Sequence, residues 1–326
     1  MEDSVGETMT VRSDYQPTPT WARIPLGMTF CGDATSVAVD SDDNVYVFNR
    51  GPTPVMIFDH DGTFVTSWGE GEFDHPHGIF IDADDQLFLV DDSAHTVQKR
   101  SRDGALLMTL GERGVSTNPW SGRPFNRPTD VAVNPTTGDI FVSDGYLNAA
   151  IHKYDADGRH IMSWGSAGSL PGEFFLPHNV SMIDSERLVV ADRENFRLQF
   201  FTTDGEFLEQ WHAFRPAAVR ASPTNQSELF VAQFPPPPGY FENPPIGCCV
   251  DIRDVNDGDL VARIGTGLLT SAADGFFAPH GLAIDSQGTL YVAEVSQSLH
   301  GRTEPPVLPS DGEAVSLRRW VRTVVT

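Results

Sequence analysis

Residues 77–92 read HGIFIDADDQLFLVDD, and this stretch decides the fold. Its apolar residues flank a polar turn, which is the pattern of two antiparallel strands joined in a hairpin. The pattern recurs along the chain. The other copies are TSVAVDSDDNVYVFN at 35–49, TDVAVNPTTGDIFVSD at 129–144, HNVSMIDSERLVVAD at 178–192, AAVRASPTNQSELFVAQ at 217–233 and HGLAIDSQGTLYVAE at 280–294. Six related units in one chain indicate a repeat architecture.

A second hairpin follows several of these units. DHDGTFVTSWG at 59–69, SRDGALLMTLG at 101–111 and DADGRHIMSWG at 155–165 each place Asp-Gly between two further apolar runs. Asp-Gly suits a tight turn, because glycine adopts a positive φ without steric cost. Four strands per unit, repeated at roughly 40–50 residues, predict an all-β fold, a six-bladed β-propeller of the NHL-repeat type.

The repeats also predict the organisation of the chain. Residues 1–32 are expected to pack on the propeller as an N-terminal segment, and residues 33–326 to form the propeller itself. A proline-rich insertion at about 234–249 reads FPPPPGYFENPPIGCC. Its prolines do not fit a central strand, so we interpret it as a loop. A lid or specificity loop and a plain surface insertion are both open interpretations.

The composition limits the classes of partner. The net charge is −23, from 45 acidic and 22 basic residues, so nucleic acid and anionic membranes are not expected to bind. We expect a small-molecule substrate instead. The three cysteines have no CxxC spacing, and neither a secretion signal nor an apolar run of membrane-spanning length is seen. The default expectation is a cytoplasmic protein.

Histidine occupies the same position in alternate repeats. In five repeats a proline precedes the first strand, and the next residue is expected to point toward the propeller axis. Around the ring this position is held by Thr35, His77, Thr129, His178, Ala217 and His280. Alternate blades lie a third of a turn apart, so the three histidines are expected to converge on the axis. Three imidazoles with an open fourth position are typical of a zinc site.

The chain also resembles a known family over about residues 33–295. LPHNV, VSDGYLNAAI, VVADRENFRLQ and APHGLAID are similar to motifs of peptidyl-α-hydroxyglycine α-amidating lyase. The resemblance implies a zinc-dependent lyase that cleaves the C–N bond of an α-hydroxyglycine-like or other N-(α-hydroxyalkyl) amide, giving an amide and glyoxylate or another aldehyde. It implies that His77, His178 and His280 hold zinc, that Tyr146 is the general base, and that Arg50 and Arg193 belong to the active site.

The resemblance further implies a calcium ion held by an aspartate after the third zinc histidine and by two backbone carbonyls. The carbonyls correspond to Val37 and Ile79, whereas Gly281 stands where the aspartate is expected. The chain therefore departs from the family pattern at this ion.

Two other functions remain open at this point. One is a metal-dependent, lactonase-like hydrolase on the same fold, although such enzymes mostly hold calcium with carboxylate and amide oxygens. The other is a non-catalytic NHL-repeat binding propeller. Neither the physiological substrate nor the oligomeric state can be read from the sequence.

Overall fold

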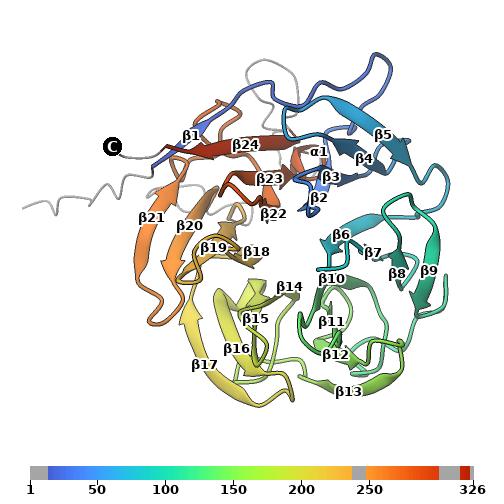
Figure 1. Cartoon of the computed structure of the whole chain (residues 1–326). Helices are drawn as coiled ribbons and strands as arrows, with labels where there is room; N and C mark the ends of the chain where they lie inside the picture. The colour runs from blue at the N-terminus through green and yellow to red at the C-terminus, as the bar shows by residue number, and fades with distance from the viewer. Residues whose placement is uncertain (1–13, 237–246, 301–315, 324–326) are drawn as a thin grey trace, which may run out of the picture.

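The computed structural model describes residues 14–236, 247–300 and 316–323. Within these ranges, the strands form six four-stranded antiparallel sheets arranged as a ring (Figure 1). The predicted all-β, six-bladed propeller is confirmed.

In every blade except the last, the four strands follow the order of the chain from the axis outward. The first blade holds β2 (Ala34–Val39), β3 (Val45–Asn49), β4 (Val55–Phe58) and β5 (Phe64–Trp68). The second holds β6 (Pro76–Ile81), β7 (Leu87–Asp91), β8 (Thr96–Arg100) and β9 (Leu106–Leu110). The third holds β10 (Pro128–Val133), β11 (Ile140–Asp144), β12 (Ala150–Tyr154) and β13 (His160–Trp164).

The remaining blades complete the ring. The fourth holds β14 (Pro177–Met182), β15 (Arg187–Asp192), β16 (Arg197–Thr202) and β17 (Phe207–His212). The fifth holds β18 (Pro216–Ala221), β19 (Glu228–Gln233), β20 (Cys249–Asp254) and β21 (Leu260–Ile264). The sixth holds β22 (Pro279–Ile284), β23 (Leu290–Glu294), β24 (Leu317–Arg322) and β1 (Tyr15–Pro17). Two short helices, η1 (Arg193–Asn195) and α1 (Ser296–His300), follow β15 and β23.

The hydrophobic core lies between blades. Six apolar clusters each join one blade to the next around the ring. Second strands such as β7 and β11 are buried at every position, whereas the outer strand β17 is mostly exposed. This gradient follows from the sequence, because the inner hairpins are almost wholly apolar and the Asp-Gly hairpins alternate apolar with polar residues.

The sixth blade is built from both ends of the described chain. β1 pairs with β24, with Tyr15 opposite Arg322, so a segment before the first repeat supplies the outermost strand (Figure 1). The Tyr15 hydroxyl donates to the Gly288 carbonyl at 2.9 Å, and its ring packs edge-on against Phe230 of the fifth blade. This strand therefore ties the start of the described chain to its end and packs against the fifth blade.

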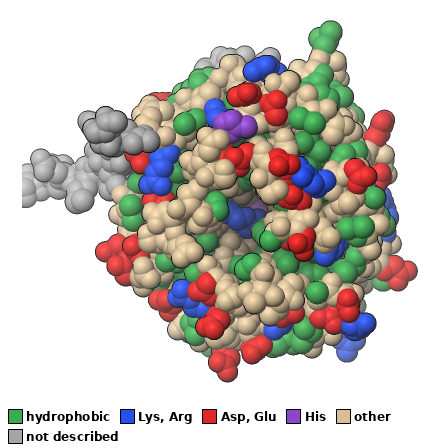
Figure 2. Space-filling view, in the orientation of Figure 1, with side chains coloured by type: hydrophobic (Ala, Val, Ile, Leu, Met, Phe, Trp, Pro, Cys, Tyr) green, Lys and Arg blue, Asp and Glu red, His purple; other side chains and the backbone are tan. Residues whose placement is uncertain are grey.

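The proline-rich insertion interrupts the fifth blade between β19 and β20. Residues 237–246 of the predicted loop lie outside the described residues, and its flanks at Phe234 and Cys248 are buried. At the centre of the ring the surface is hollowed, and Lys or Arg side chains are seen within the hollow (Figure 2). No helix in the described part of the chain is long and apolar enough to cross a membrane.

Candidate metal centre

A local irregularity turns the histidines toward the axis. In the three strands that carry them, the pairing with the second strand is disturbed over Pro76–Ile79, Pro177–Asn179 and Pro279–Gly281. A bulge of this kind leaves a residue out of the ladder and redirects its side chain. The proline begins the strand without needing to donate a ladder hydrogen bond. The Pro-His dipeptide therefore places an imidazole in the channel.

The structure brings the three predicted ligands together. The ring centroids of His77, His178 and His280 lie 5.0, 4.9 and 4.6 Å apart, which is close to an equilateral triangle. One nitrogen from each ring lies within 4.8 Å of the others. Among the described residues, this is the group of His, Cys, Asp and Glu side chains that could hold a metal ion.

Backbone carbonyls set the tautomer of each histidine. Nδ1 of His77 lies 2.5 Å from the Thr129 carbonyl, and Nδ1 of His178 lies 2.7 Å from the Ala217 carbonyl. Nδ1 of His280 lies 2.7 Å from the Thr35 carbonyl. A carbonyl only accepts, so each Nδ1 must carry the proton and donate it. Each Nε2 then carries the lone pair with which an imidazole can bind a metal.

Burial keeps these imidazoles neutral. Burial lowers the pKa of His77 to about 3. It also lowers the pKa of His178 well below its ordinary value, and the positive charge of Arg193 adds to the effect. The pKa of His280 is lowered in the same way by burial and by His77. Neutral imidazole is the form that binds metal, so the donor set fits zinc.

Tyr146 lies at the edge of the histidine triangle. Its hydroxyl is 2.8 Å from Nε2 of His77 and 3.3 Å from Nε2 of His178. The preceding Gly145 is needed here, because a Cβ on it would lie 2.3 Å from the Pro177 carbonyl. The SDGY motif thus lets the chain leave β11 close against the fourth blade, which places the phenol beside the candidate metal ligands.

Arg50 and Arg193 face the same small cavity as Tyr146 and His280. This cavity has a volume of about 140 Å³. Arg50 donates from Nη1 to Ser298 at 2.8 Å and forms an ion pair with Asp33 at 3.4 Å. Its buried Nε has no hydrogen-bond partner among the described residues, which leaves a donor for a ligand. The structure therefore brings all six predicted catalytic and zinc-binding residues to one place.

Sequence reasoning missed a second pair of arginines. The Arg127 guanidinium lies 4.7 Å from the centroid of the Tyr146 ring, and Arg193 lies 6.0 Å from it. Arg215 lines the cavity and shares the carboxylate of Glu194 with Arg193. Arg127 and Arg215 each stand directly before the proline that begins a blade. That recurring Arg-Pro dipeptide is the signal that could have found them.

The implied calcium position does not fit a calcium ion. Gly281 packs so closely that a Cβ would lie 2.6 Å from Cα of Ser36 and 3.0 Å from the Thr35 carbonyl. A carboxylate side chain therefore has no room there. Val37 and Ile79, both buried in first strands, would offer only carbonyl oxygens, whereas calcium takes six to eight oxygens and usually some carboxylates.

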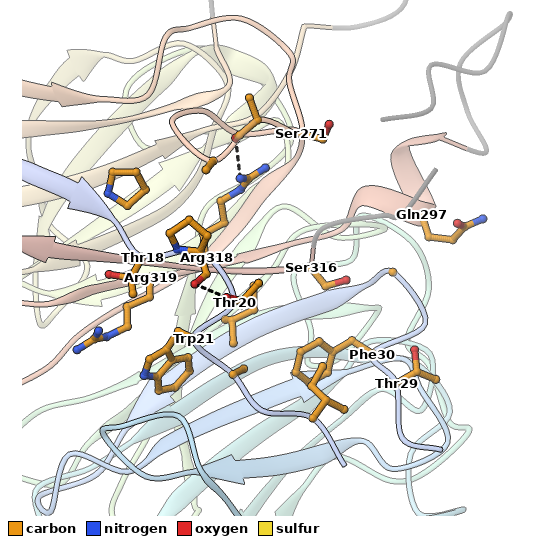
Figure 3. A pocket seen from close by; sticks show the side chains of 18 of the residues that line it. Thr18, Thr20, Trp21, Thr29, Phe30, Ser271, Gln297, Ser316, Arg318 and Arg319 are labelled. Atoms are coloured by element: carbon orange, nitrogen blue, oxygen red, sulfur yellow. Dashed lines mark hydrogen bonds between the residues drawn. The ribbon is translucent and has the colours of Figure 1, made fainter. Parts of the chain in front are cut away.

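A larger cavity, of about 920 Å³, lies at the edge of the sixth blade (Figure 3). It is lined by Trp21, Phe30 and Arg318 among others. Arg318 is already paired with Glu294 and donates to the Ala272 carbonyl at 2.8 Å. The larger cavity shares no lining residue with the small cavity beside the histidine triangle, and we assign no chemistry to it.

Comparisons with known proteins agree with this fold and show the family. No family model matches the chain. It is 33% identical over 308 residues to human NHL repeat-containing protein 3, covering 84% of this chain and 80% of the relative. It is 31% identical over 249 residues to the probable peptidyl-alpha-hydroxyglycine alpha-amidating lyase of Caenorhabditis elegans, covering 75% and 68%. It is 32% identical to mouse peptidyl-glycine alpha-amidating monooxygenase, covering 81% of this chain but only 29% of the relative.

Among solved structures, a streptogramin B lyase superposes with a TM-score of 0.56 at 11% identity, covering 95% of this chain and 98% of that one, which supports the propeller fold alone. The fold and site thus define a six-bladed NHL-repeat propeller with a buried three-histidine centre. More particularly, the chain belongs to the family of peptidyl-α-hydroxyglycine α-amidating lyases and NHL repeat-containing protein 3. It spans less than a third of the mouse monooxygenase that it matches.

Proposed function

We propose that this protein is a zinc-dependent lyase that cleaves the C–N bond of an N-(α-hydroxyalkyl) amide. The observation that carries the proposal is the Tyr146 hydroxyl beside two neutral, buried histidines whose Nε2 atoms face a common centre. The lyase names of several relatives support the same reaction class.

His77, His178 and His280 would hold the zinc ion. When bound there, zinc supplies Lewis-acid chemistry that makes a substrate hydroxyl more acidic. The chain's own residues then have separate roles. Tyr146, as the phenolate, would accept the hydroxyl proton and be restored when it gives that proton up, since its oxygen lies at the edge of the triangle.

The proton and electron balance is simple. As the O–H proton moves to Tyr146, the oxygen lone pair forms the C=O bond of the aldehyde and the C–N bond breaks. The departing amide nitrogen takes a proton back from Tyr146, so the products are a primary amide and glyoxylate or another aldehyde. No water is consumed.

The arginines would orient the substrate. Arg50 and Arg193 line the cavity beside His280, and a guanidinium binds a carboxylate through paired hydrogen bonds. A substrate that carries a carboxylate on the hydroxylated carbon, such as an N-acyl-α-hydroxyglycine, meets this requirement. The small cavity favours a compact group at that end.

Product analysis tests the reaction class. The zinc-loaded protein should convert N-acyl-α-hydroxyglycines to equal amounts of amide and aldehyde, and it should not open lactones. Lactone hydrolysis would instead support the hydrolase alternative.

Variants test the residue roles. Tyr146→Phe should keep its zinc and lose about 10²–10⁴-fold in kcat, whereas His178→Ala should lose both zinc and turnover. His212→Ala, an exposed histidine on β17, is the matched control and should change neither. Unchanged zinc content in His178→Ala would overturn the proposal and favour a non-catalytic binding propeller.

A further inference from the structure

Arg220 is a mostly buried cation in the channel wall that the proposed reaction does not use. It lies on β18, the first strand of the fifth blade, and its side chain is 12% exposed. Its Nη2 donates to Oδ2 of Asp130 at 3.0 Å. Its Nη1 donates to the carbonyls of Val180 at 3.0 Å and Val219 at 3.2 Å. One guanidinium therefore joins the third, fourth and fifth blades.

These partners occupy repeated positions in their blades. Asp130 is one residue beyond the axial position of the third blade, held by Thr129. Val180 and Val219 are two residues beyond the axial positions of the fourth and fifth blades. The set is thus a carboxylate in one blade and carbonyls in the next two.

The same pattern describes the calcium ligands that the family resemblance implies. There the carboxylate would stand one residue after His280, at Gly281, in the sixth blade. The carbonyls of Val37 and Ile79 are two residues after the axial positions of the first and second blades. The Arg220 set is this pattern moved half a turn around the six-fold ring.

The two halves of the ring differ in whether a carboxylate side chain is present at this repeat position. At Gly281 there is no room for a side chain, so the implied calcium position lacks its carboxylate. On the opposite side, the carboxylate of Asp130 is buried, and Asn179 donates to it as well as Arg220. A buried carboxylate needs a positive partner, because an unpaired buried charge is very unfavourable.

We propose that the folded protein neither binds nor needs the implied calcium ion, and that the Arg220 guanidinium is an internal cation that links three blades in the same ligand pattern on the opposite side of the ring. Arginine suits this role. It is charged at all physiological pH values, and its planar fork reaches a carboxylate and two carbonyls at once. Blades three, four and five are thus linked by a cation that the chain itself carries.

Thermal unfolding tests the inference without using activity, so its outcome is independent of the proposed lyase. The zinc-loaded wild-type protein is measured in calcium-free buffer and with millimolar calcium, together with Arg220→Met, Asp130→Asn and the double variant. Wild-type Tm should not change with calcium. Arg220→Met should lower Tm by about 5–10 °C, because it leaves Asp130 buried without a charged partner.

The double variant is the matched control. Removing both charges should restore more than half of the Tm lost in Arg220→Met, since the unpaired carboxylate is gone. A calcium-dependent rise in wild-type Tm, or stoichiometric calcium in the purified protein, would overturn the inference. Additive effects of the two single variants would also overturn it. If Arg220→Met does not fold, the wild-type titration and the comparison of Asp130→Asn with the double variant still decide.

Discussion

At the scale of single residues, Glu194 organises the arginines of the cavity. It accepts from Nε of Arg193 at 2.9 Å and from Nη2 of Arg215 at 2.6 Å. Arg193 in turn lies 5.4 Å from the Phe234 ring centroid. The carboxylate thus positions a guanidinium that we propose binds substrate.

The ionised state of Glu194 predicts how the stability of the protein depends on pH. Burial raises the pKa of Glu194, but the hydrogen bond from Arg215 and the charges of both arginines outweigh it and hold the pKa below its usual 4.5. A carboxyl with a lowered folded pKa contributes stability above the unfolded value, and this is lost as pH falls through the folded pKa. Glu194→Gln should therefore cost about 1–3 kcal/mol at neutral pH, and the difference from wild type should shrink below pH 4.5.

Unfolding midpoints measured across this pH range check the prediction. Glu206→Gln, an exposed carboxylate in the same blade, should stay near wild type throughout. A difference for Glu194→Gln that stays constant with pH would contradict the assigned ion pairs.

Sequence reasoning found the site residues that repeat or belong to motifs. The histidines stand at one repeat position, and Tyr146, Arg50 and Arg193 fall in recognisable stretches. Arg127 and Arg215 share only the Arg-Pro dipeptide, which was not used as a signal, and Asp130 was missed because its partner lies in another blade. Asp130 and Arg220, for example, are 90 residues apart in the chain. No local pattern shows such a contact.

At the scale of elements, β1 completes the sixth blade by pairing with β24, the last strand of the described chain. Arg322 of β24 pairs with Asp14 at 2.8 Å and with Glu228 of β19 at 2.7 Å. Together with the Tyr15 contacts, these bonds join the sixth blade to the fifth. The six hairpins could be predicted from alternating residues, but a three-residue strand carries too little pattern to be predicted by itself.

Side-chain direction on β1 gives a matched pair of variants. Tyr15 is buried and Gln16 is exposed. Tyr15→Ala should cost about 3–5 kcal/mol, since it removes a large buried aromatic side chain. Gln16→Ala should change stability by less than about 0.5 kcal/mol. Denaturant unfolding of both variants measures this, and equal effects would show that β1 does not anchor the ring.

At the scale of the whole molecule, the fold explains how one dipeptide builds the candidate metal centre. A Pro-His dipeptide begins the first strand of every second blade. Three histidines about 100 residues apart in the sequence therefore meet at the propeller axis. This convergence was predictable because propeller geometry is regular. The departure from the family's implied calcium was visible at Gly281, whereas the link that Arg220 makes between three other blades needed the three-dimensional contacts.

The acidic surface and the basic cavity are separate features of the molecule. The chain carries a net charge of −23, yet Arg50, Arg193 and Arg215 line the small cavity next to His280. The charge that matters for a carboxylate substrate is therefore local, and overall composition does not reveal it.

The proposed reaction depends on one zinc ion that His77, His178 and His280 bind together. Anomalous X-ray scattering from crystals of the zinc-loaded protein, recorded on both sides of the zinc absorption edge, tests this most directly. We predict one strong peak on the channel axis, within bonding distance of all three Nε2 atoms. If the peak is missing at the three histidines, or if zinc is found only elsewhere, the histidines do not form the proposed zinc site.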